Sequence, residues 1–274
     1  MKGVDRTIPK TRSRDANAPR VRASHARRWR ALLGLLWLVA GPAGAEEVVV
    51  GAAASLREPL RRLEGAFETT HPGSVALSFG ASSWLATQIR VGAPVDVFLS
   101  ADERQVDSLQ RDGFALGATR VVFAGNELTL IVSPRSELDI AEPDDIAQPG
   151  LRRFALPAAA VPLGHYARGW LARRGLIEAL GDRIVQTADA RATLAAVELG
   201  LADAALVYAT DAALARRARI GLTPPHEEQP TIVYVGILTP RGDAKPEAHA
   251  FLDFLLGPGR SELEADGFLP PGDR

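Results

Sequence analysis

The chain has 274 residues, of which 46% are hydrophobic and 24% are charged, and its formal net charge is −1. The absence of cysteine excludes disulfides, thiolate metal sites and a lipid-anchoring cysteine. Residues 46–274 contain 22 basic and 31 acidic residues, a net charge of −9, and this acidity disfavours nucleic-acid binding.

The first 45 residues have the organisation of a signal peptide. A basic stretch precedes the apolar core Ala31 to Ala40, and Ala43-Gly44-Ala45 supplies the small residues that signal peptidase reads. The apolar core is too short to span a bilayer. We therefore expect cleavage after Ala45 and Sec export to the periplasm. Twin-arginine export through Arg27-Arg28 is the alternative, and the long basic region also allows a start codon downstream of Met1.

After residue 45, strand-like and helix-like patterns alternate along the chain. Apolar runs predict strands at 48–50, 75–79, 96–99, 121–123, 128–132, 154–156, 184–185, 204–208 and 232–238. Apolar residues at helical spacing predict helices between them, as with Leu56, Leu60, Leu63 and Phe67 after the first strand. Two more helices are expected at 248–256 and 263–268. This alternation predicts an α/β fold with mainly parallel sheets.

The length that remains after the signal peptide favours two small lobes over one compact domain. Ala124-Gly125-Asn126 separates two apolar strands and is a natural place for the chain to change lobe. The strand at 232–238 is long enough to cross back. We therefore predict a signal peptide at 1–45, a first lobe formed by 46–128 and 235–274, and a second lobe at 129–234.

Four strand-to-helix junctions place a small residue, a hydroxyl or both at the start of a helix. They are Ala54-Ser55, Ser82-Ser83, Leu163-Gly164 and Asp189-Ala190. The first turn of a helix has backbone N–H groups without intrahelical partners and a partial positive potential, so it can hold an oxyanion without a cationic side chain. In open α/β sheets such junctions gather at the carboxyl edge of the strands. Two lobes whose edges face each other would enclose a small anion.

Four segments, taken in order, resemble the periplasmic molybdate-binding proteins of ATP-binding-cassette transporters. They are Ala52-Ala53-Ala54-Ser55-Leu56, Phe79-Gly80-Ala81-Ser82-Ser83 with Gly92 to Asp102, Val161 to Ala167, and Leu206 to Ala212. The resemblance extends from about Glu47 to Phe268. It implies a two-lobed type II periplasmic binding-protein fold that closes on a tetrahedral dianion in the cleft between the lobes.

The resemblance also implies a set of ligand-binding residues. Ser55 and Ser82 would bind the anion from the first lobe. The backbone N–H groups of Leu163 and Ala190 and the hydroxyl of Tyr208 would bind it from the second lobe. Such a set suits molybdate or tungstate, because a fully deprotonated oxyanion has only acceptors and all five groups are donors.

The chain departs from the family pattern at three places near these residues. Leu163 stands where many relatives have alanine, Ala81 where they often have another serine, and Trp84 is unusually large. Because only the N–H of Leu163 would be used, its side chain can point away from the ligand. These departures bear on anion selectivity more than on the mode of binding.

Structural roles compete with the binding roles. Ser55 and Glu58 have the spacing of a capping box, Ser82 and Ser83 could both be helix caps, and Tyr208 could be a core tyrosine. Arg191, like Arg57, lies beside a proposed binding turn, where a steering role is favoured over anion contact. The order of the four motifs favours binding at Ser55, Ser82 and Tyr208, and Ser55 is expected to cap its helix as well.

These observations favour a periplasmic receptor, expected to be a monomer, that delivers molybdate, and also tungstate, to an inner-membrane transporter permease. The alternatives are the same fold binding sulfate or another oxyanion, and an anion-sensing regulatory domain, which the export signal disfavours. No His-Glu-x-x-His or Gly-x-Ser-x-Gly motif occurs, so neither a catalytic metal site nor a hydrolase is supported. We expect no enzymatic activity, no cofactor and no metal-ligating side chain.

Overall fold

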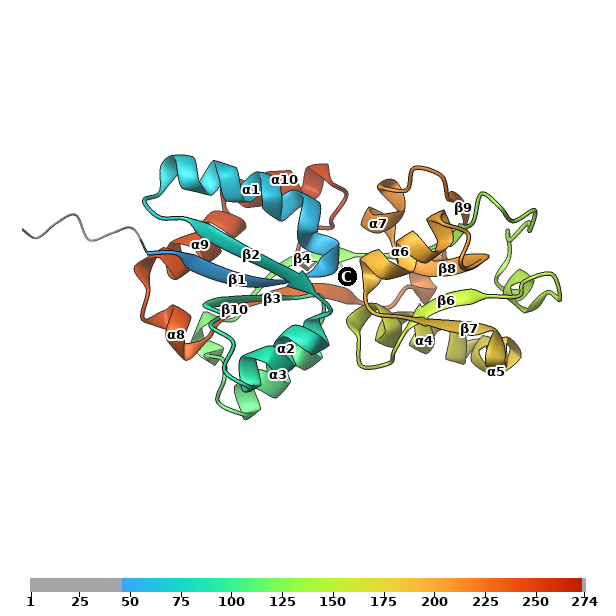
Figure 1. Cartoon of the computed structure of the whole chain (residues 1–274), viewed down its shortest axis with the longest axis horizontal. Coiled ribbons are helices and arrows are strands. Elements are labelled where there is room, and N and C mark those ends of the chain that lie inside the picture. The colour runs from blue at the N-terminus through green and yellow to red at the C-terminus, as the bar shows by residue number, and fades with distance from the viewer. Residues whose placement is uncertain (1–45, 273–274) are drawn as a thin grey trace, which may run out of the picture. The chain divides into compact units, whose positions relative to one another are not determined.

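The structure is a computed structural model that describes residues 46–272, so the predicted signal peptide lies outside the described residues. Two five-stranded sheets form two lobes (Figure 1). The strand order is β2-β1-β3-β10-β4 in the first sheet and β7-β6-β8-β5-β9 in the second. The strands are β1 Val48–Ala53, β2 Val75–Gly80, β3 Val97–Ser100, β4 Val121–Asn126, β5 Leu128–Val132, β6 Phe154–Pro157, β7 Ile184–Thr187, β8 Ala204–Tyr208, β9 Arg219–Leu222 and β10 Ile232–Leu238.

Each sheet is mixed: four strands run in one direction and one runs in the opposite direction, so the predicted parallel arrangement holds for most strands but for only half of the strand pairings. In the first sheet β1 pairs in parallel with β2 and β3, and β10 runs antiparallel between β3 and β4. In the second sheet β6 pairs in parallel with β7 and β8, and β5 runs antiparallel between β8 and β9. The strands that run antiparallel to their neighbours, β5 and β10, are the first strands after the chain passes from one lobe to the other. At these points the chain enters the new sheet from the side that faces the other lobe.

Helices cover both faces of the first sheet (Figure 1). The helices of this lobe are α1 Arg57–Thr70, α2 Ser82–Arg90, α3 Glu103–Arg111, α8 Pro240–Asp243, α9 Pro246–Leu256 and α10 Pro258–Ala265. Helix α1 packs with α9 and α10, where the rings of Phe67 and Phe251 lie 5.3 Å apart. On the other face, Leu85 of α2 and Val106 of α3 share a core with Phe98. The helices predicted near the C-terminus therefore pack on the first lobe.

The second sheet is also buried on both faces. Its helices are α4 Pro162–Arg173, α5 Leu176–Leu180, α6 Ala190–Glu198 and α7 Ala209–Ala213. Along β8, Leu206 belongs to the core that contains Trp170 of α4, whereas Val207 belongs to the core that contains Val197 of α6. A strand buried on both faces has no polar side, which explains why β8 is a continuous apolar run. Short 3-10 turns complete the described elements: η1 Ala54–Leu56, η2 Gly117–Thr119, η3 Pro143–Ala147, η4 Gly181–Arg183 and η5 His226–Glu228.

Two segments connect the lobes. Glu127 alone separates β4 from β5, and residues 223–231 lead from β9 back to β10. The Gln229 side chain joins these segments, because its amide accepts from the Leu128 N–H at 2.8 Å and donates to the Leu128 carbonyl at 2.9 Å. In the sheets, β5 starts at Leu128 and β10 pairs with β4 from Ile232 onward. The division at 128/129 and 234/235 stays a prediction.

No helix between residues 46 and 272 is long and apolar enough to span a membrane.

Candidate functional site

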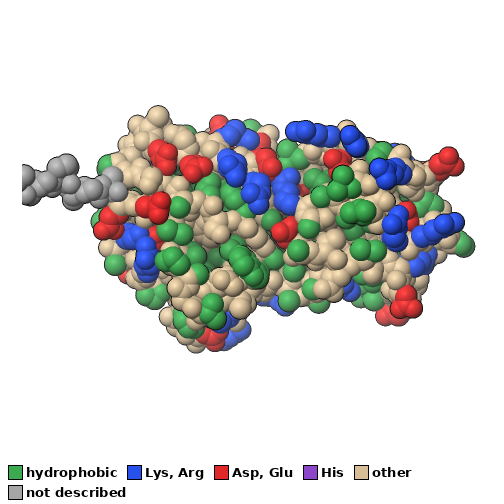
Figure 2. All heavy atoms as spheres, in the orientation of Figure 1, with side chains coloured by type: hydrophobic (Ala, Val, Ile, Leu, Met, Phe, Trp, Pro, Cys, Tyr) green, Lys and Arg blue, Asp and Glu red, His purple; other side chains and the backbone are tan. Residues whose placement is uncertain are grey.

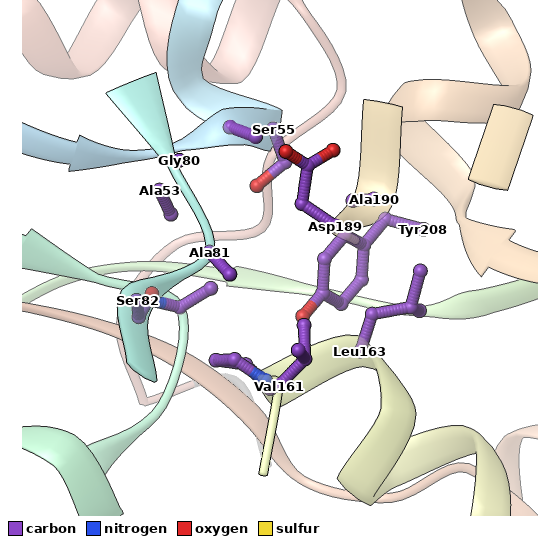
Figure 3. Close-up of a pocket in the computed structure, with 13 residues that line it drawn as sticks. Ala53, Ser55, Gly80, Ala81, Ser82, Val161, Leu163, Asp189, Ala190 and Tyr208 are labelled. Atoms are coloured by element: carbon purple, nitrogen blue, oxygen red, sulfur yellow. The ribbon is translucent and has the colours of Figure 1, made fainter. Parts of the chain in front are cut away.

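All five residues that the sequence singles out border one pocket between the lobes (Figure 3). The space that they border measures about 220 Å³, part of it open to solvent. The lining residues are Ala53, Ala54, Ser55, Gly80, Ala81, Ser82, Ala101, Val161, Pro162, Leu163, Asp189, Ala190 and Tyr208.

Helix starts surround this pocket. Leu163 lies in the first turn of α4 and Ala190 begins α6, so their N–H groups have no intrahelical acceptor. Ser82 begins α2 and Ser55 lies in η1, just before α1. The elements follow β1, β2, β6 and β7, whose parallel carboxyl ends bring them together. The positive ends of several helices therefore point toward one small space.

Gly164 allows the start of α4 to approach the preceding turn. A Cβ atom at this position would lie 2.2 Å from the Ala158 carbonyl oxygen and 2.7 Å from that of Pro157. Because both neighbours are backbone atoms, no side-chain rotation could relieve the clash. Glycine is therefore required to place the Leu163 N–H at the pocket. The Leu163 side chain is buried and points away from Ser55 and Ser82 (Figure 3).

Ser55 does not cap α1, and the capping-box prediction is wrong. The residue before α1 is Leu56, and no side chain caps either η1 or α1. The Ser55 hydroxyl instead lies 3.0 Å from the Tyr234 hydroxyl, and Ser55 is buried. Glu58, the other residue of the predicted capping box, pairs with Arg191 instead. The 3-10 turn moves the residue before α1 from Ser55 to Leu56, which takes Ser55 out of register for capping.

Ser82 also makes no cap. The residue before α2 is Ala81, and α2 has no side-chain cap. The Ser82 hydroxyl accepts a hydrogen bond of 3.1 Å from the Ala101 N–H, which holds the buried side chain at the pocket. Ser83, the neighbouring candidate, does not line the pocket. The exposed ring of Trp84 does not line it either.

Tyr208 ends β8 and lines the pocket (Figure 3). The residue is only 1% exposed, yet its hydroxyl has no hydrogen-bond partner among residues 46–272. Burial raises the pKa of Tyr208 well above its usual range, so the group stays protonated. A buried donor without a protein partner is costly, and such a group is expected to meet a ligand.

A network behind Ser55 was not predicted. Asn126 donates to the Tyr234 hydroxyl at 3.3 Å and to the Thr210 hydroxyl at 2.8 Å, and all three residues are buried. Tyr234 and Ser55 are 179 positions apart in the sequence. Tyr234 lies within an apolar strand, where a tyrosine gives no sign of a partner on another element.

Arg191 links the two lobes. Its Nε donates to the Ala54 carbonyl at 3.3 Å, and its guanidinium pairs with the Glu58 carboxylate and with Asp211, whose Oδ1 lies 3.3 Å from Nε. Burial lowers the pKa of Arg191 and raises the pKa of Asp211 to about 6, against the attraction between them. For Arg191 a steering role was favoured over anion contact, and the structure shows its side chain engaged in these contacts. Figure 2 shows basic and acidic side chains interspersed where the lobes meet.

The remaining candidates have structural surroundings. The Arg57 guanidinium stacks 4.6 Å above the Phe79 ring, and Asp102 caps α3 through a bond from the Gln105 N–H. Asp189 was predicted as part of a junction and lines the pocket, but its Oδ1 accepts from the Ala192 N–H and so caps α6. Across residues 46–272, no group of three or more histidine, aspartate or glutamate side chains could hold a metal ion. Apart from the Asp189 carboxylate, the polar side chains that line the pocket are the hydroxyls of Ser55, Ser82 and Tyr208.

The comparisons with known proteins agree with this architecture. Residues 48–269 match the family described as bacterial extracellular solute-binding protein. The molybdate-binding protein ModA of Haemophilus influenzae is 31% identical, over 78% of this chain and 85% of that protein. The ModA of Escherichia coli is also 31% identical, over 87% of this chain and 96% of that protein.

Solved structures show the same fold. The periplasmic molybdate-binding protein of Azotobacter vinelandii superposes with a TM-score of 0.72 at 28% identity and covers 82% of this chain and 99% of that one. The sulfate-binding protein SubI of Mycobacterium tuberculosis superposes with a TM-score of 0.75 at 16% identity, over 83% of this chain and 88% of that one. At this identity the likeness shows the fold alone. The architecture is the two-lobed type II fold, and the family is one of solute-binding proteins rather than enzymes. The chain belongs to the bacterial extracellular solute-binding protein family, in the group that contains the ModA relatives.

Proposed function

We propose that this protein captures molybdate outside the cytoplasm and delivers it to the permease of an inner-membrane ATP-binding-cassette transporter. The observation that carries the proposal is the set of neutral donors around one small pocket, including the unpartnered hydroxyl of Tyr208. The similarity to molybdate-binding relatives over most of the chain supports the same ligand.

The chemistry of the pocket suits a dianion with four oxygen atoms. In the proposed site, the hydroxyls of Ser55, Ser82 and Tyr208 and the N–H groups of Leu163 and Ala190 donate to the anion. Hydrogen bonds to a charged acceptor are about twice as strong as neutral ones. Together with the helix dipoles, they balance the charge of the anion without a cationic side chain.

The proposed mechanism is closure of the lobes on the ligand. Two of the donors, Ser55 and Ser82, come from the first lobe, and the other three come from the second. Neither lobe alone completes the shell, so the anion stabilises the arrangement in which the lobes meet. The closed arrangement would then be the form that a permease recognises, with the protein acting as a monomer after removal of residues 1–45.

Tungstate is the second ligand that we propose. A tetrahedral dianion of the same charge can use the same five donors. Sulfate has the same charge and differs mainly in size, so it is the competitor that the pocket must exclude by fit. The fold it shares with a sulfate-binding protein makes sulfate the most informative comparison.

Isothermal titration calorimetry on residues 46–274 tests the proposal. Molybdate, tungstate, sulfate and phosphate are titrated separately at pH 8, and tryptophan fluorescence provides an independent signal. We expect micromolar or tighter binding of molybdate and tungstate and much weaker binding of sulfate. No response to molybdate at micromolar concentration would overturn the proposal, and tighter binding of sulfate would reassign the ligand.

A further inference from the structure

Two buried residues behind the pocket, Asn126 and Tyr234, are connected to Ser55 in a way that determines the direction of their hydrogen bonds. Asn126 ends β4, Tyr234 lies in β10, and Ser55 lies in η1. The Asn126 amide nitrogen is 3.3 Å from the Tyr234 hydroxyl, which is 3.0 Å from the Ser55 hydroxyl. Distances alone leave either hydroxyl of the second contact free to be the donor. The surroundings of Asn126 decide between them.

The first step is the orientation of the Asn126 amide. The backbone N–H of Glu127 lies 2.9 Å from Asn126 Oδ1. A backbone N–H can only donate, so the atom that it faces must be the amide oxygen. The amide NH₂ of Asn126 consequently faces Tyr234 and Thr210, and Tyr234 is the acceptor in its contact with Asn126.

The orientation of Asn126 determines the direction of the hydrogen bond between Tyr234 and Ser55. Tyr234 accepts from Asn126, and Ser55 is the other hydrogen-bond partner of its hydroxyl among residues 46–272, so the buried Tyr234 proton is satisfied by donation to Ser55. Burial raises the pKa of Tyr234 above its usual range, which keeps this proton in place. Ser55 then accepts from Tyr234, and its own proton is left to point into the pocket.

The other two hydroxyls of the pocket have the same polarity. Ser82 accepts from the Ala101 N–H, a group that cannot accept, so the Ser82 proton is also free to point at a ligand. The Tyr208 hydroxyl has no partner among the described residues and faces the pocket. All three hydroxyls therefore present protons.

We infer that Asn126 and Tyr234 are positioning residues that fix the Ser55 hydroxyl as a donor, so that at this position of the pocket a ligand meets a proton and not an acceptor. The inference rests on the proposed function, because it concerns the same pocket. A fully ionised oxyanion accepts from every hydroxyl. Hydrogen phosphate carries one proton that needs an acceptor, and a hydroxyl with its own proton aimed at the ligand presents that proton instead.

A double-mutant cycle tests whether Tyr234 acts through Ser55. Tyr234→Phe removes the hydroxyl but keeps the ring in the core, and Ser55→Ala removes the group on which it acts. We expect Tyr234→Phe to weaken molybdate binding about 3- to 10-fold in the otherwise unchanged protein, within the effect of one hydrogen bond. In the Ser55→Ala background the same change should have no effect. Equal losses in both backgrounds would overturn the inference, because a purely structural role would not depend on Ser55.

A second variant reverses the polarity. Asn126→Asp replaces the amide donor by a carboxylate acceptor, so Tyr234 would donate to residue 126 and accept from Ser55, whose oxygen would then face the pocket without its proton. We expect the ratio of molybdate affinity to hydrogen phosphate affinity at pH 8 to fall at least tenfold. Adding Tyr234→Phe to Asn126→Asp should restore most of that ratio, because the relay is then interrupted while the added charge remains.

The outcomes separate the two proposals. An unchanged affinity ratio in Asn126→Asp, with an unchanged melting temperature, would overturn the relay but leave the ligand assignment intact. If the unmodified protein fails to bind molybdate, the proposed function fails, and the same variants are compared on the fully ionised anion that binds most tightly. Absence of binding by all four anions would overturn both. Should Asn126→Asp fail to fold, the Ser55–Tyr234 cycle decides the question.

Discussion

Replacing Asp211 should change how stability depends on pH. Asp211 lies in α7, is fully buried, and neither carboxylate oxygen has a hydrogen-bond partner among residues 46–272. Its nearest described cation is Arg191, with Nε at 3.3 Å from Oδ1. Burial raises the pKa of Asp211 to about 6, with Arg191 opposing and Asp189 adding to the increase. The carboxyl group therefore holds its proton more tightly in the folded protein than in the unfolded chain.

The sign and size of the effect follow from linkage. The ordinary pKa of an aspartate carboxyl group is 3.8, so between about pH 4 and pH 6 the folded state binds more protons than the unfolded state. Stability from this group is thus fully present below pH 4 and is lost as the pH rises toward 6. A difference of about two pKa units corresponds to about 3 kcal/mol, at about 1.4 kcal/mol per unit.

Asp211→Asn removes this titration while keeping the shape of the side chain. The free energy of unfolding is compared between the variant and the unmodified protein at each pH. We expect the variant's value to gain about 3 kcal/mol relative to that of the unmodified protein between pH 4 and pH 7. Urea unfolding without ligand, followed by tryptophan fluorescence at pH 4, 5, 6 and 7, measures it. Asp253→Asn on the exposed face of α9 serves as the control, with a flat difference expected. A flat profile for Asp211→Asn, or one that falls with pH, would refute the reasoning.

Three further changes probe the pocket and the contact between the lobes. Ser82→Ala should weaken molybdate binding by about 1–3 kcal/mol, the effect of a lost hydrogen bond to a charged group. Ser83→Ala, a change outside the pocket lining, should leave the affinity measured by calorimetry unchanged. Equal effects of the two changes would contradict the assignment of Ser82. Glu58→Gln removes the charge that pairs with Arg191 across the lobes. The affinity for molybdate should therefore fall by at most about fivefold, and this loss should be smaller at high salt concentration. An increase in molybdate affinity would contradict closure of the lobes on the ligand. Gly164→Ala places a Cβ at 2.2 Å from a backbone oxygen and should cost about 1–3 kcal/mol in thermal unfolding, an expectation that an unchanged melting temperature would disprove.

The sequence by itself predicted the lobes, the mainly parallel sheets and the helix starts that border the pocket. These features are local: an apolar run such as β8 must be buried, and a small or hydroxyl residue after it begins a helix. The family resemblance of the four segments, together with the Asp189-Ala190 junction, was enough to select Ser55, Ser82, Leu163, Ala190 and Tyr208, which line one pocket. Local patterns were less reliable about caps, since one 3-10 turn at Ala54–Leu56 removed the predicted cap at Ser55.

Only the tertiary structure decided the partners of those residues. Tyr234 meets Ser55 across 179 positions, Arg191 meets Ala54 across 137, and Asn126 meets Thr210 across 84. The physical reason is that hydrogen bonds and ion pairs are set by distances of about 3 Å in the folded chain, which no spacing along the sequence specifies. The sequence determined which groups can donate to an anion, and the fold decided where their protons point.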